Sequence, residues 1–67
     1  MKIRVKVWGR GEEERELPEG ASVEKLLEGM EIDREAVVVR VNGRICPESE
    51  KLSAGDEVLI IPIVTGG

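Results

Sequence analysis

Residues 37–67 read VVVRVNGRICPESEKLSAGDEVLIIPIVTGG, an apolar run, a turn signal, a polar segment and a second apolar run. The first run, residues 36–41, is rich in β-branched valine, which favours a strand. Asn42-Gly43 follows it, and this pair is the strongest short signal for a two-residue β-hairpin. Residues 44–46 then begin the returning strand, and Pro47 ends that strand because proline lacks the N–H that a strand ladder needs.

The second apolar run, residues 57–63, is predicted to be a strand in the middle of the sheet, because nearly every position is apolar. Residues 52–56 form the turn that leads into it. At the other end of the chain, residues 2–8 alternate charged and apolar side chains, which is typical of a half-buried strand. Turn residues at 9–11 and a strongly charged segment at 12–17 complete a hairpin, and the charge of that second strand suits an exposed sheet edge.

One short amphipathic helix is expected between the two halves of the sheet. Ser22 stands at the N-cap position, and apolar residues follow at helical spacing: Val23, Leu26, Leu27 and Met30. Gly29 is predicted to be the C-cap, and residues 33–35 to form a tight turn before the next strand. The fold class is therefore α+β, a mixed sheet of four to five strands with one helix packed across one face.

Alternation divides the strand residues between two faces of this sheet. The helix side receives a predicted core that packs with Val23, Leu26 and Leu27 and consists of Ile3, Val5, Val7, Val37, Val39, Val41, Val58 and Ile60. The opposite face receives an uncovered aliphatic patch with a basic rim, namely Leu59, Ile61, Ile63 and Val38 with Arg4, Lys6 and Arg40. Such a patch is a natural partner site, and a homodimer or local strand packing is the alternative.

Composition excludes several functional classes. At 67 residues the chain has room for one domain, and a net charge of −4 argues against nucleic-acid binding, which needs a basic surface. With no histidine and one cysteine, neither an intramolecular disulfide nor a tetrahedral zinc site is expected, and no metal site is predicted. The charged N-terminus has no signal-peptide hydrophobic region and no segment is long enough for a membrane span, so we expect a cytoplasmic protein.

Four other features receive structural interpretations. Cys46 precedes a proline, has no histidine partner and is read as structural or incidental. Trp8, the single aromatic residue, either caps its hairpin or touches the aliphatic patch, and packing is favoured. The carboxylates of residues 12–16 are split between two strand faces, which favours a solvated edge over a metal site. The glycines of residues 9–11 lie in a hairpin turn and are not a nucleotide-binding loop.

The chain ends with Gly66-Gly67, which cannot contribute side chains to a core. Two terminal glycines taken alone are most simply a frayed end. Glycine also lets a chain extend through a constriction that rejects side chains, and residues 64–67 in extended conformation span about 13 Å. We therefore divide the chain into a domain at residues 1–63 and a flexible diglycine tail at residues 64–67.

The whole set resembles the β-grasp, or ubiquitin-like, fold, and in particular the sulfur-carrier branch typified by ThiS and MoaD. The resemblance rests on the order and spacing of Val41-Asn42-Gly43, Pro47, Leu52, Gly55-Asp56, the apolar strand and the terminal diglycine. Each element is common alone, but their combination along nearly the whole chain is specific.

This resemblance implies a carrier that is not itself an enzyme. A partner, an adenylating (E1-like) enzyme that uses ATP and Mg²⁺, activates the C-terminal carboxylate, and a sulfur donor enzyme then supplies the sulfur of a thiocarboxylate. Carried over to this chain, the reacting group is the carboxylate of Gly67, with Thr65 and Gly66 as the tail that presents it. The chain itself is expected to bind no cofactor, since it has no glycine-rich phosphate loop between a strand and a helix.

The destination of the sulfur stays open between thiamine, molybdopterin and tRNA thiolation, each with its own sulfur-accepting synthase. Two alternatives use the same fold differently. A ubiquitin-like modifier is joined through Gly67 to lysines of target proteins, and a ubiquitin-like docking domain binds through its sheet and never reacts at its terminus.

Overall fold

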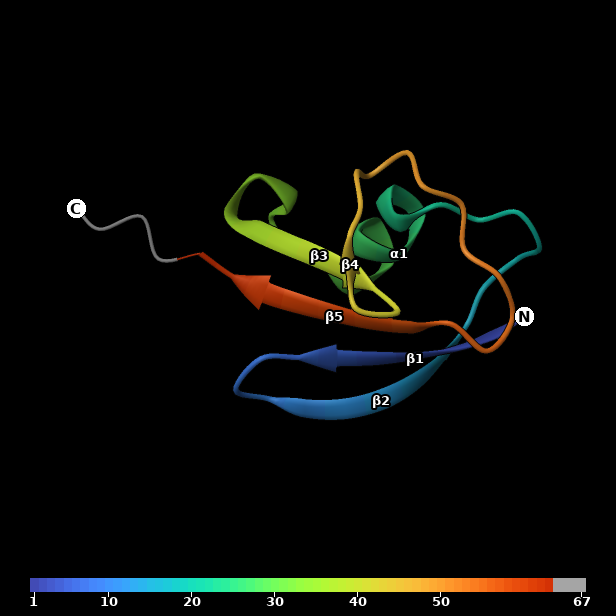
Figure 1. Ribbon diagram of the computed structural model, residues 1–67, viewed down its shortest axis with the longest axis horizontal. Coiled ribbons are helices and arrows are strands. Elements are labelled where there is room, and N and C mark those ends of the chain that lie inside the picture. The colour runs from blue at the N-terminus through green and yellow to red at the C-terminus, as the bar shows by residue number, and fades with distance from the viewer. Residues whose placement is uncertain (64–67) are drawn as a thin grey trace.

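The computed structural model describes residues 1–63, which form one sheet with a helix on one side (Figure 1). The strands are β1 (Lys2–Val7), β2 (Gly11–Glu16), β3 (Val37–Val41), β4 (Arg44–Ile45) and β5 (Glu57–Pro62). The helices are α1 (Val23–Met30) and a 3₁₀ turn, η1 (Arg34–Ala36). The predicted tail at residues 64–67 lies outside the described residues.

The five strands lie in the order β2-β1-β5-β3-β4, so the apolar strand β5 occupies the centre, as predicted. It runs parallel to β1 and antiparallel to β3, while the two hairpins pair antiparallel. The charged strand β2 lies at one edge and the short strand β4 at the other (Figure 1). This is the α+β mixed sheet that the sequence predicts.

The hairpin between β3 and β4 has the geometry that its sequence requires. Asn42 and Gly43 both have positive φ, 51° and 86°, the backbone conformation of the turn that suits a two-residue hairpin. The turn sets Arg40 opposite Ile45 and Val41 opposite Arg44.

Helix α1 begins as predicted and ends later than predicted. The Ser22 hydroxyl accepts a hydrogen bond from the Lys25 N–H at 3.3 Å, as an N-cap does. The prediction of Gly29 as C-cap is wrong, because the helix continues to Met30 and Glu31 takes the left-handed cap conformation at φ 57°. Because the helix continues past Gly29, Met30 and Ile32 lie where they pack against the core.

The core lies between α1 and the sheet. Its buried side chains come from β1, α1, β3 and β5, and every predicted core residue is buried except Val7 and Val37, which are half-buried at its border. Leu52 is an addition that the sequence analysis missed, since it was assigned to a turn. Its side chain is only 3% exposed, and its N–H donates to the Ala21 carbonyl at 2.8 Å. Burial of such a side chain contributes about 1.5–3 kcal/mol.

Within residues 1–63 no helix combines the length and the hydropathy needed to cross a bilayer. Helix α1 has eight residues, whereas a span needs about 20.

Candidate functional site

The face of the sheet that α1 does not cover, named the open face below, is defined by the strand register. Lys6 lies beside Glu12 of β2 on one side and Leu59 of β5 on the other. Leu59 in turn pairs with Arg40. Since directly paired residues point to the same side of a sheet, these four side chains form one row across the open face.

The predicted aliphatic patch lies on this face. Val38 pairs with Ile61, and both are half-buried, as is Leu59. Ile63 follows the end of β5 and is 43% exposed. Its N–H donates to the carbonyl of Ala36, the residue before β3, at 2.7 Å, so the pairing of the two chain segments extends as far as Ile63. The predicted face assignment is thus correct for the three paired residues.

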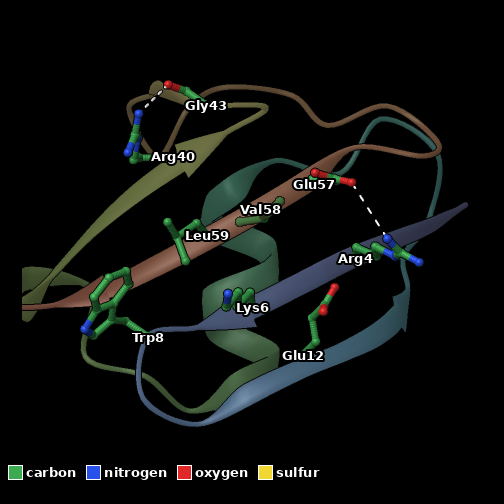
Figure 2. Close-up of a pocket in the computed structure, with 9 residues that line it drawn as sticks. All are labelled: Arg4, Lys6, Trp8, Glu12, Arg40, Gly43, Glu57, Val58 and Leu59. Carbon is green, nitrogen blue, oxygen red and sulfur yellow. Dashed lines mark hydrogen bonds and ion pairs between the residues drawn. The ribbon is translucent and has the colours of Figure 1, made fainter.

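Trp8 belongs to the open face, and the preference for packing is wrong. The Trp8 N–H donates to the Ile60 carbonyl at 2.9 Å, which continues the β1–β5 ladder by one residue. The indole lies on the same side as Lys6 and Leu59 (Figure 2), and it is 64% exposed. The sequence alone could have placed Trp8 on this face, because Trp8 follows Lys6 by two residues and residues two apart in a strand share a face.

Ile45 is a second apolar side chain that the sequence analysis did not place on this face. It pairs with Arg40 and therefore extends the row that contains Leu59, and it is 75% exposed. The two-residue hairpin already determines this register, so counting back from Asn42-Gly43 was sufficient to find it.

A shallow hollow of about 280 Å³ lies in the open face, between Trp8, Leu59 and charged side chains of the neighbouring strands (Figure 2). Arg4 forms an ion pair with Glu57 at 3.8 Å. Arg40 Nη2 donates to the Gly43 carbonyl at 2.8 Å, while its Nε is buried with no hydrogen-bond partner among the described residues. Arg4, Lys6 and Arg40 of the predicted basic rim line this hollow together with Leu59.

The carboxylates of β2 are divided between the faces, as predicted. Glu12 and Glu14 pair with Lys6 and Arg4 on the open face, whereas Glu13 pairs with the buried Val5. Among residues 1–63 no cluster of three aspartate, glutamate, cysteine or histidine side chains has the geometry of a metal site.

Cys46 lies away from the open face. It is half-buried and packs against the core, and its Sγ lies 3.4 Å from the Arg44 carbonyl. The other predicted reactive positions, Thr65, Gly66 and Gly67, lie outside the described residues.

Comparison with solved structures finds the same architecture in other small proteins. A putative molybdopterin converting factor subunit 1 from Pyrococcus furiosus shares 34% identity at a TM-score of 0.80, over 94% of this chain and 98% of that chain. Small archaeal modifier protein 1 of Haloferax volcanii is similar in fold, at 19% identity and a TM-score of 0.77 over 94% and 98% of the two chains.

A third similar structure is a complex of subunits 1 and 2 of molybdopterin-converting factor from Helicobacter pylori. The matched chain has 16% identity and a TM-score of 0.73, with both chains fully covered. The two likenesses below 25% identity show the fold, a ubiquitin-like β-grasp. The model of the ThiS family matches residues 4–67, from β1 to the terminal glycine. With its fold and nearly its whole length accounted for in this way, the chain belongs to the ThiS family.

Proposed function

We propose that this protein is a sulfur carrier whose Gly67 carboxylate is adenylated by a partner enzyme and converted to a thiocarboxylate. The observation that carries the proposal is the extent of the family match, which runs through Gly66-Gly67 to the last residue. A match confined to the folded domain supports a docking module equally well, whereas a match that includes the diglycine supports chemistry at the terminus.

The chemistry follows from the properties of a carboxylate. A carboxylate resists nucleophilic attack because its charge is delocalised and it has no good leaving group. An oxygen of the Gly67 carboxylate attacks the α-phosphorus of ATP, and pyrophosphate leaves. A sulfide equivalent from the donor enzyme then attacks the acyl carbon, and AMP leaves as the thiocarboxylate forms. ATP and Mg²⁺ belong to the adenylating enzyme in this scheme, and the carrier binds neither.

The open face is proposed to hold the adenylating enzyme. Its apolar residues, Leu59, Ile61, Ile63 and Val38, supply contact area, and Trp8 adds an exposed indole, the residue type most often found at interface hot spots. Arg4, Lys6 and Arg40 form a basic rim that selects an acidic partner surface. Because β5 contributes Leu59 and Ile61 and continues toward Gly67, docking on this face fixes where the tail begins.

The later partners are proposed to be a sulfur donor enzyme and a sulfur-accepting synthase, with the reaction located in the cytoplasm. The Helicobacter pylori structure, a complex of two subunits of molybdopterin-converting factor, supports a second protein that binds this fold. The sulfur pathway is open between thiamine, molybdopterin and tRNA thiolation.

One second function has an observation in its favour. The fold likeness to small archaeal modifier protein 1 supports conjugation of Gly67 to lysines of target proteins. Both functions begin with the same activated carboxylate, so they differ only in the nucleophile, sulfur or a lysine amine.

Three proteins expressed in the native host test the proposal: the wild-type chain, a chain lacking Gly66 and Gly67, and Leu59→Asp. We expect wild type to carry the modified terminus, the truncated chain to fold and bind the adenylating enzyme without reacting, and Leu59→Asp to fold without being activated. A truncated chain that retains full biological function identifies a docking domain and contradicts the carrier.

A further inference from the structure

A second surface lies at the outer edge of β3. Strand β4 pairs only with Arg40 and Val41, so the first half of β3 has no neighbouring strand on that side. A groove of about 360 Å³ runs along this edge. Its lining comes from α1, η1, β3, β4 and the segment after β4. The apolar lining includes Val23, Leu27, Val37, Val39, Cys46 and Pro47, and Val38 and Ile45 form its border with the open face.

The direction of the backbone groups along β3 follows from its hydrogen bonds. The Ala36 carbonyl accepts from the Ile63 N–H, and the Asn42 N–H donates to the Glu57 carbonyl. The backbone N–H and C=O groups of the even-numbered residues of β3 therefore point toward β5. The Cys46 N–H donates to the Val39 carbonyl at 3.1 Å. The backbone N–H and C=O groups of the odd-numbered residues of β3 therefore point away from β5, toward the outer edge. Within the described residues, no backbone hydrogen bond uses the Val39 N–H or the Val37 carbonyl.

The Val37 carbonyl and the Val39 N–H are far enough apart for a single residue of an added strand to bond to both. In a parallel ladder, a residue opposite Val38 donates its N–H to the Val37 carbonyl and accepts from the Val39 N–H. An added segment therefore gains two main-chain hydrogen bonds at this edge. The residue that makes them shares the face of Val38, so the residues before and after it point to the helix side and enter the apolar groove.

The rim of the groove is acidic. Arg34 and Glu48 line it, and Arg34 contacts Glu48 at 3.6 Å, Glu24 at 3.6 Å and Glu28 at 3.8 Å. Three carboxylates thus share one guanidinium, which leaves two negative charges uncompensated (−3 + 1 = −2). A second copy of this chain would bring the same excess of negative charge, so the rim disfavours self-association and favours a basic partner.

We propose that the outer edge of β3 binds a short extended segment of another protein, with aliphatic residues flanked by lysine or arginine. The backbone of the segment pairs with Val37 and Val39, its aliphatic side chain enters the groove beside Leu27, and its basic residues lie against Glu24, Glu28 and Glu48. The site does not involve Gly67, and it borders the open face at Val38 and Ile45.

The test uses the full chain, labelled with ¹⁵N, and the peptide acetyl-Lys-Ser-Val-Thr-Val-Ser-Lys-amide. When its threonine lies opposite Val38, its valines and lysines all point to the helix side. We expect chemical-shift changes at Val37, Val39 and Cys46 on titration, and slower hydrogen exchange of the Val39 amide in the complex. Two matched peptides are compared with it: one with glutamate in place of both lysines, and one with an N-methylated central threonine. Each is expected to bind about tenfold more weakly, a loss of charge complementarity in the first and of one backbone donor in the second.

Two protein variants of equal net charge distinguish a specific effect of the acidic rim from a general effect of the protein's net charge. Glu24→Gln/Glu28→Gln/Glu48→Gln is expected to weaken the lysine-flanked peptide about tenfold, and Glu12→Gln/Glu13→Gln/Glu14→Gln on β2 to leave it unchanged. Absence of shift changes at millimolar peptide, shifts confined to β2 or the open face, or equal weakening by both variants overturns the proposal.

Discussion

Asn42 and Asp56 are joined side chain to side chain, with Asn42 Nδ2 donating to Asp56 Oδ1 at 3.0 Å. Asn42 Oδ1 also accepts from the Glu57 N–H at 3.0 Å, and Asp56 Oδ2 accepts from the Ser53 N–H at 2.8 Å. The residue that forms the β3–β4 turn therefore also fixes the start of β5. Through this link the hairpin positions the strand that carries the open face and leads to the C-terminus.

Removal of this link should destabilise the fold without unfolding it. Asp56→Ala loses two accepted hydrogen bonds, each of which contributes about 0.5–1.5 kcal/mol, so we expect the free energy of unfolding to fall by about 1–3 kcal/mol. Guanidinium denaturation followed by circular dichroism measures this change.

Asn42→Gly provides the matched control, because glycine keeps the positive φ of 51° while removing the side chain. We expect a loss of about 0.5–1.5 kcal/mol. The double variant should cost less than the sum of the two single ones, since they share one interaction. Strict additivity is the result that argues against a coupled link.

Leu52 gives a second prediction about stability. Leu52→Ala leaves a cavity in the core and should lower the free energy of unfolding by about 2–5 kcal/mol. Ile45→Ala, at a side chain that is 75% exposed, should change it by less than about 0.5 kcal/mol. Similar losses for the two variants, measured by denaturation, would mean that Leu52 is not a core residue in solution.

The sequence predicts the strands, and the central place of residues 57–63 among them, because alternation, the Asn42-Gly43 turn and the apolar run at residues 57–63 all agree. Leu52 was not predicted to be a core residue, because a single leucine between polar residues shows no periodicity. Only its contact with Ala21 and α1 buries it. The prediction of Gly29 as C-cap was wrong because it relied on the frequency of glycine just past a helix end. In the structure the helix continues to Met30, which packs against the core.

The apolar part of the open face was predictable because it follows from strand parity alone. The places of Trp8 and Ile45 were also predictable, the first by alternation from Lys6 and the second from the two-residue hairpin at Asn42-Gly43. The groove beside β3 depends on how short β4 is and on where the segment after Pro47 turns toward α1. No local pattern contains that information.

The open face gives a third prediction, about affinity for the adenylating enzyme. Trp8→Ala is expected to weaken binding about thirtyfold, the effect of losing about 2 kcal/mol at an interface hot spot. The free energy of unfolding should hardly change, because the indole is 64% exposed in the free protein. Isothermal titration calorimetry with the enzyme measures the affinity.

Glu19→Ala, at an exposed position between β2 and α1, is the control for this experiment and should bind like wild type. If Trp8→Ala also binds like wild type, the open face is not the docking surface that we propose.

The ion pairs of Arg34 give a fourth prediction, on salt. The side chain is 44% exposed, so Arg34→Gln should cost no more than about 1 kcal/mol in dilute buffer. In about 1 M NaCl the difference from wild type should nearly vanish, because the Debye length is then about 3 Å. Urea denaturation at the two salt concentrations measures it, and a loss that persists in high salt indicates packing by the arginine stem instead.

The central claim concerns one functional group, the carboxylate of Gly67. Intact mass spectrometry of the protein purified from its native host under sulfur-replete growth, with fragmentation of the C-terminal peptide, examines that group directly. We expect a mass increment equal to the replacement of one oxygen by sulfur, located on Gly67. An unmodified carboxylate throughout, or Gly67 found only in isopeptide bonds to lysines, contradicts the sulfur carrier.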